Sequence, residues 1–77
     1  MKRYYLAPNN GRKSFYGKAE VLEDGGIETL FSYGTPVIQR KNGRLTRLWD
    51  NWTLTTGTHI KAFCGLTKKE YLALPMV

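Results

Sequence analysis

The stretch that decides the fold is VIQRKNGRLTRL, residues 37–48. Asn42-Gly43 lies at its centre, and this dipeptide is typical of a two-residue type I′ turn because both residues tolerate positive φ angles. The turn predicts an antiparallel hairpin with a fixed register. Moving away from the turn, the expected pairs are Lys41 with Arg44, Arg40 with Leu45, Gln39 with Thr46, Ile38 with Arg47 and Val37 with Leu48. This register gathers four cations near the tip of the hairpin.

Further strands are predicted before this hairpin. Residues 14–22 alternate between the two faces of a strand, and Asp24-Gly25-Gly26 offers the positive φ angles of a tight reversal. Residues 27–33 are therefore expected to return as the partner strand. Residues 4–6 are interpreted as a short strand or an arm packed against the body. We expect the chain to bend at residues 34–36, because the proline at position 36 cannot donate to a central strand pair.

The C-terminal third is predicted to be helical. Residues 52–54 form either a fifth short strand or a loop that crosses the sheet. Thr58 is expected to cap a short helix with one apolar face, and Gly65 is its expected stop. Thr67-Lys68-Lys69-Glu70 is a capping box, which predicts the start of a second helix that ends by Pro75.

Together these elements predict an α+β fold. A small antiparallel sheet of four to five strands, either open or curled into a half-open barrel, is followed by two short C-terminal helices. At 77 residues the chain lies below the usual domain size of about 100 to 150 residues, so residues 1–77 are expected to form a single domain. Cys64 is the only cysteine, and the sequence shows no signal peptide and no long apolar run. We therefore expect a cytoplasmic protein with no internal disulfide and no membrane association.

The charged residues are segregated along the chain. The net charge is +6; residues 1–18 carry five cations without an acid, residues 20–28 carry four acids without a base, and residues 40–47 carry four more cations. Such segregation favours an anionic partner through long-range attraction. Simple solubility is the alternative explanation, because small domains often carry a net charge of magnitude about 2 to 8.

The sequence offers little for catalysis. His59 is the only histidine, and five positions separate it from the only thiol, Cys64. On one helix this spacing turns the two side chains about 140° apart, so they cannot form a nucleophile and base pair. Ser14 and Ser32 lack the surroundings of a nucleophile elbow. We therefore expect no enzyme, metal site or cofactor, and we interpret His59 as structural.

Binding chemistry is better supplied, because several aromatic residues lie beside cations. In single-stranded nucleic acid sites, cations follow the phosphates while rings stack on bases. The candidate pairs are Lys13 with Tyr16, Lys18 with Phe31 or Tyr33, and Arg47 with Trp49. The rings could instead build the core, and the hairpin charges could simply protect a sheet edge from aggregation. The candidate residues for binding nucleic acid or another partner are Lys13, Tyr16, Lys18, Tyr33, Arg40, Lys41, Arg44, Arg47 and Trp49.

Four segments carry a resemblance to known proteins: KSFYGKA (13–19), SYGTPV (32–37), RLWDNW (47–52) and TTGTHI (55–60). They are similar to a family of small uncharacterised proteins from bacteriophages, plasmids and gut bacteria, which has no established activity. The resemblance implies a small accessory protein that acts in the cytoplasm of a host cell.

Two functions fit this context. The first is binding of nucleic acid or a nucleoprotein complex through the basic hairpin. The alternative is a protein-directed inhibitor of a host system, for example an anti-CRISPR-type protein, which acts by protein–protein interaction. The chain is expected to be a monomer or a homodimer, with the sheet face that carries Ile38 and Leu45 as the candidate dimer surface.

Overall fold

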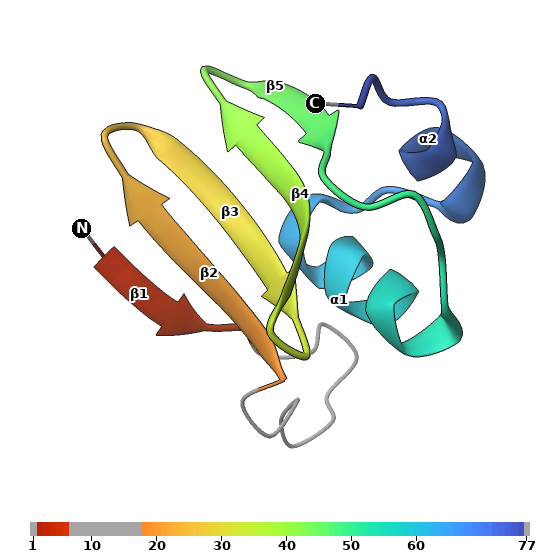
Figure 1. Cartoon of the computed structure of the whole chain (residues 1–77), viewed down its shortest axis with the longest axis horizontal. Coiled ribbons are helices and arrows are strands. Elements are labelled where there is room, and N and C mark those ends of the chain that lie inside the picture. The colour runs from red at the N-terminus through yellow and green to blue at the C-terminus, as the bar shows by residue number, and fades with distance from the viewer. Residues whose placement is uncertain (1, 7–17, 77) are drawn as a thin grey trace.

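The computed structural model describes residues 2–6 and 18–76 and shows an open antiparallel sheet followed by two helices (Figure 1). The strands follow one another in the order β1-β2-β3-β4-β5, so β1 and β5 are the two edges. The predicted α+β fold is confirmed, with an open sheet rather than a barrel. The elements are β1 (Lys2–Tyr5), β2 (Ala19–Asp24), β3 (Ile27–Ser32), β4 (Thr35–Lys41), β5 (Arg44–Arg47), α1 (Leu54–Cys64) and α2 (Lys68–Leu72).

Two-residue turns join β2 to β3, β3 to β4 and β4 to β5. The hairpin at Asn42-Gly43 has the predicted register, with Lys41 opposite Arg44 and the next three pairs as expected. The outermost expected pair, Val37 with Leu48, lies beyond the end of β5, where the Leu48 N–H donates to the Val37 carbonyl at 3.1 Å.

The expected bend at residues 34–36 is instead the tight turn Tyr33-Gly34, and β4 begins directly after it. Pro36 lies inside β4, where the pairing with β3 shifts register between Leu30 and Phe31. A bulge of this kind tolerates proline within a strand, because the local ladder is already interrupted.

The core lies between one face of the sheet, here called the inner face, and the helices. Val21, Leu30 and Ile38 are neighbours across β2, β3 and β4, and each is fully buried. Ile60 of α1 and Tyr71 of α2 complete this cluster. The expectation that the Ile38 face forms a dimer surface was wrong, because the helices of the same chain cover it.

Helix α1 begins at its N-cap Thr53, five residues before the predicted cap Thr58. The Thr53 hydroxyl accepts a hydrogen bond from the Thr56 N–H at 3.1 Å. Residues 52–54 are therefore coil, cap and first helical residue, and the fifth strand is β1. Gly57 has low helix propensity, but its bare α-carbon lets the Trp52 indole lie directly against the helix. The early start of α1 is therefore accompanied by two local contacts, the Thr53 cap and the packing of Trp52 on Gly57.

Two predicted helix signals are confirmed. Gly65 ends α1 with φ of 77°, in the left-handed region that glycine adopts most easily. In the capping box of α2 the Thr67 hydroxyl accepts from the Glu70 N–H, while the Glu70 carboxylate accepts from the Thr67 N–H at 2.9 Å. These hydrogen bonds also lower the pKa of the exposed Glu70 carboxyl.

Candidate nucleic-acid interface

The four cations of the β4–β5 hairpin divide between the two faces of the sheet. Side chains alternate along a strand, so Arg40 and Arg47 share the inner face with Ile38. Lys41 and Arg44 lie opposite each other on the other face, here called the outer face. The cluster that the sequence predicts as one surface is therefore two separate pairs.

Arg40 is held by contacts within the fold. Its Nε donates to the Glu28 carboxylate on the neighbouring strand at 2.9 Å, and its guanidinium carbon lies 4.3 Å from the centre of the Phe63 ring. This hydrogen bond lowers the pKa of the Glu28 carboxyl and raises that of Arg40. Tyr4 also donates to Glu28, at 3.4 Å. Arg40 thus links the sheet to α1 and is a poor candidate for a phosphate contact.

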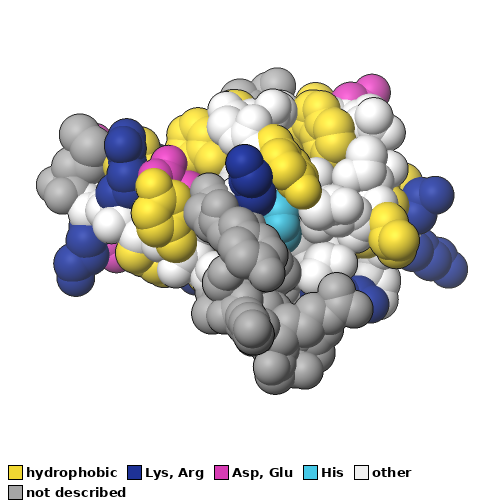
Figure 2. All heavy atoms as spheres, turned by 90° about the horizontal axis from the view of Figure 1, so that it is seen from below, with side chains coloured by type: hydrophobic (Ala, Val, Ile, Leu, Met, Phe, Trp, Pro, Cys, Tyr) yellow, Lys and Arg dark blue, Asp and Glu magenta, His cyan; other side chains and the backbone are white. Residues whose placement is uncertain are grey.

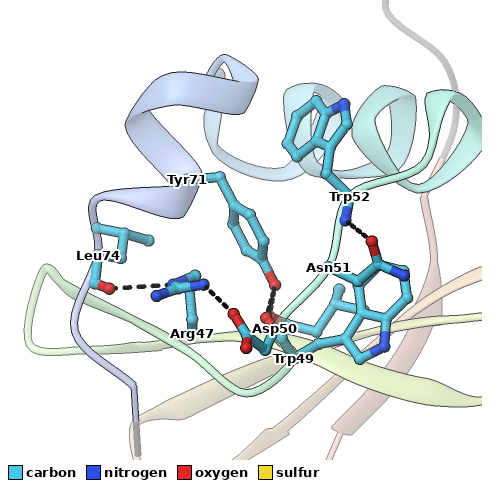
Figure 3. A network of polar contacts seen from close by, with 8 residues as sticks. Arg47, Trp49, Asp50, Asn51, Trp52, Tyr71 and Leu74 are labelled. Carbon is cyan, nitrogen blue, oxygen red and sulfur yellow. Dashed lines mark hydrogen bonds and ion pairs between the residues drawn. The ribbon is translucent and has the colours of Figure 1, made fainter.

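Arg47 also ties parts of the chain together (Figure 3). Its Nε donates to the Leu74 carbonyl at 3.0 Å, and its Nη1 pairs with Asp50 at 3.1 Å. Only 12% of the side chain is exposed. The predicted pair of Arg47 with Trp49 is wrong, because the ring that the guanidinium faces is that of Tyr71, at 5.9 Å.

Trp49, a candidate binding residue, is partly buried and packs against the core, which favours the alternative that its ring builds the core. Its carbonyl accepts a hydrogen bond from the Tyr71 hydroxyl at 2.9 Å, as Figure 3 shows. The segment after β5 is therefore fixed to α2, which closes the C-terminal end of the core.

Lys41 and Arg44 remain exposed at the tip of the hairpin. With Gln39, Asn42 and Thr46 they line an open hollow of about 490 Å³ on the outer face. This lining contains two cations and three neutral side chains that can donate hydrogen bonds, and it contains no carboxylate. The hollow is suited to an anion such as a phosphate group.

Lys18 and Tyr33 form the predicted pair at the opposite end of β4. The Lys18 ammonium lies 5.9 Å from the centre of the Tyr33 ring, and 59% of Tyr33 is exposed. Phe31, the alternative partner considered for Lys18, is only partly exposed. Lys13 and Tyr16, the remaining candidate pair, lie outside the residues that the structure describes.

The sequence matches a family of unknown function (DUF8033) over residues 5–73. The chain belongs to this family. No curated protein and no solved structure matches it. The uncharacterised family that the sequence suggested is thereby confirmed, whereas an origin in phages, plasmids or gut bacteria stays a prediction.

One contact in this DUF8033 chain was missed by sequence reasoning. The Ser32 hydroxyl on β3 lies 2.8 Å from Nδ1 of His59 and 2.9 Å from the hydroxyl of Thr56, both on α1. All three residues are buried, and burial lowers the pKa of His59. His59 lies in the middle of α1 and not in its first turn as expected. Because Ser32 and His59 are 27 positions apart, no local pattern could have revealed the contact.

The Ser32–His59 pair ties the sheet to α1. Its hydroxyl and imidazole have the separation of a nucleophile and base, but Ser32 is 3% and His59 2% exposed, so a substrate has no access to the pair in this conformation. Burial also raises the pKa of the Cys64 thiol, which donates to the Ile60 carbonyl at 3.4 Å.

Residues 2–6 and 18–76 contain neither a cluster of metal ligands nor a helix suited to spanning a membrane. Within these ranges, no three side chains of His, Cys, Asp or Glu lie together as a metal site would require. None of the helices seen there combines the length and the apolar character needed to cross a membrane.

Proposed function

We propose that this protein is a non-enzymatic accessory module that binds nucleic acid, alone or within a nucleoprotein, through the outer face of the β4–β5 hairpin. The observation that supports this proposal most directly is that the four hairpin cations are divided between the two faces of the sheet. Arg40 and Arg47 are engaged inside the fold, whereas Lys41 and Arg44 are exposed side by side and line a hollow without a carboxylate. We place this activity in the cytoplasm of a host cell that carries a phage or another mobile element.

The chemistry of the hollow supports contacts to a phosphate backbone. Arg44 can offer a planar pair of N–H donors to one phosphate, and Lys41 can act as a point charge on the next. Gln39, Asn42 and Thr46 add neutral donors beside them. The net charge of +6 would strengthen long-range attraction to a polyanion before contact.

The test is a fluorescence-anisotropy titration of labelled single-stranded DNA, duplex DNA and RNA, over salt concentrations from about 50 to 200 mM. The wild-type protein is compared with Lys41→Gln/Arg44→Gln. Losing two phosphate contacts should lower the slope of log K against log salt by about 2 for duplex and about 1.4 for single strands.

The matched control is Lys61→Gln/Lys68→Gln, which removes the same charge from two exposed lysines on the helices. This control should keep the wild-type slope, because neither lysine lines the hollow. Equal loss in both variants would show that only the total charge matters. Binding by the hairpin variant with an unchanged slope would exclude the hollow as the site.

A second candidate function is a protein-directed inhibitor, such as an anti-CRISPR-type protein. One observation favours it: the strand pairing places three partly exposed apolar residues, Leu22, Ile27 and Phe31, on the outer face, which the helices do not cover. Contact with a host protein through this face would depend only weakly on salt. Inhibition of a CRISPR nuclease that Ile27→Glu abolishes and Lys41→Gln/Arg44→Gln spares would favour this function over the first.

A further inference from the structure

Two hairpin turns of this protein share one backbone conformation but differ in sequence. Asn42-Gly43 and Tyr33-Gly34 both have φ angles of 52° and 79°. Asparagine is among the residues best suited to the first position, whereas a bulky side chain at positive φ is an outlier. Tyr33 therefore occupies a position where its backbone preference is poor, so the turn alone does not account for an aromatic ring here.

The Tyr33 ring packs against the protein over only part of its surface. The Tyr33 ring lies 5.7 Å from the buried His59 ring, tilted by 37°, yet 59% of the residue is exposed. Its neighbour Ser32 is fixed to His59 and Thr56 by short hydrogen bonds. The ring thus projects from a rigid base and leaves most of its surface to the solvent.

A cation accompanies this ring. The Lys18 ammonium lies 5.9 Å from the ring centre, at the outer limit of a cation–π contact, and the Tyr33 N–H donates to the Lys18 carbonyl at 2.8 Å. On the face drawn in Figure 2, part of the histidine (cyan) is visible beside a hydrophobic and a basic side chain. An exposed ring on a fixed base with a lysine beside it is the arrangement that a stacked base and its phosphate require.

We propose that Tyr33 stacks on an unpaired nucleobase while Lys18 contacts an adjoining phosphate, so that the nucleic acid bound is single-stranded. This proposal rests on the proposed function and adds a second contact to it. The seven residues of β4 separate the Tyr33-Gly34 turn from the Asn42-Gly43 tip by about 23 Å. The ring contacts His59 of α1, on the side of the inner face, whereas the hollow lies on the outer face, so one strand must pass around the end of the sheet to reach both. At about 3.4 Å per nucleotide, a strand of about 12 nucleotides spans about 40 Å, which exceeds the separation along β4.

The test measures how variants of Tyr33 bind two ligands that differ only in their bases. Tyr33→Asn removes the ring and installs the residue that the other turn uses at the same φ angle, so the turn should still form. The two ligands are a 12-nucleotide single strand and the same strand with abasic sites, which keeps the phosphates and removes the bases. Tyr33→Phe is the control, because it keeps a ring that can stack.

We expect Tyr33→Asn to weaken binding of the normal strand by about 5- to 150-fold and to leave binding of the abasic strand nearly unchanged. Tyr33→Phe should bind both strands as the wild type does. Circular dichroism checks that each variant is folded at the assay temperature.

Several results would overturn the proposal. Wild-type affinity of Tyr33→Asn for the normal strand would do so, and so would an equal loss for both strands, which would show that the ring touches no base. Either result would leave the hairpin site standing if Lys41→Gln/Arg44→Gln still lowers the salt slope. Absence of binding by the wild-type protein would overturn both proposals together.

Discussion

Tyr71 offers the sharpest test of how this fold is held together. The residue is fully buried, and its hydroxyl lies 2.6 Å from the Val37 carbonyl oxygen and 2.9 Å from the Trp49 carbonyl oxygen, so its single proton is shared between the two acceptors. Through these contacts α2 is joined to β4 and to the segment after β5. Tyr71→Phe removes the hydroxyl and keeps the ring, so it isolates this polar link.

The stability lost in Tyr71→Phe depends on the two carbonyl groups that the hydroxyl contacts. Val37 also accepts from the Leu48 N–H, so the main loss falls on the Trp49 carbonyl. A buried polar group that loses its partner costs about 1 to 3 kcal/mol, and we expect about 1.5 to 2 kcal/mol for Tyr71→Phe. For 77 residues the entropy of unfolding is about 160 cal/mol/K, so the melting temperature should fall by about 10 °C.

The measurement is thermal and urea unfolding followed by circular dichroism. The control is Tyr5→Phe, which removes a hydroxyl from a tyrosine that is 64% exposed, and it should change stability by less than about 0.5 kcal/mol. If Tyr71→Phe were no less stable than this control, the link from α2 to the sheet would not carry the fold as argued.

The same residue predicts a loss of stability in alkali. Burial raises the pKa of Tyr71 to about 12 from its ordinary value of 10.0. The unfolded chain therefore loses this proton first, so the stabilisation is complete below about pH 10 and is lost as the pH rises through about 12. Tyr71→Phe should lack this part of the alkaline loss, and an identical pH profile for both proteins would contradict the assignment.

Two further predictions concern α1. Burial lowers the pKa of His59, so as the pH falls the imidazole is protonated in the unfolded chain before it is protonated in the folded protein. The contribution of His59 to stability should therefore be fully present above about pH 6.5 and decrease as the pH falls from there toward the folded pKa. Urea midpoints that stay constant between about pH 7.5 and 5.5 would contradict this prediction. Gly57→Ala should destabilise the protein although alanine favours helix, because the added methyl would overlap the Trp52 indole and overpacking costs about 1 to 3 kcal/mol; the exposed control Thr55→Ala should be neutral or slightly stabilising in the same unfolding assay.

Part of the candidate site was within reach of the sequence. Strand alternation alone places Arg40 with Ile38 on one face and Lys41 with Gln39 on the other, once the Asn42-Gly43 turn fixes the register. The apolar Ile38 and Leu45 then mark the inner face. This argument would have separated the hairpin cations, and it was missed because all four were treated as one surface.

The Ser32–His59 contact could not be predicted, because it joins β3 to α1 across 27 positions and local propensity gives no signal for it. The early start of α1 was predicted wrongly for a different reason. Thr53 and Thr58 are both suitable N-caps, and Gly57 between them has low helix propensity, so the pattern favoured the later cap.

The sequence by itself determined that the strands come first and the two helices last. It also determined the Asn42-Gly43 hairpin and its register, the capping box at Thr67 and the end of α1 at Gly65. These features depend on φ preferences and hydrogen bonds between residues a few positions apart. Only the tertiary structure decided which cations are free to meet a partner. An arginine is available for binding only if no carbonyl, carboxylate or ring of the folded chain already holds it, and for Arg40 and Arg47 such partners come from Glu28, Phe63 and Leu74, between 12 and 27 positions away.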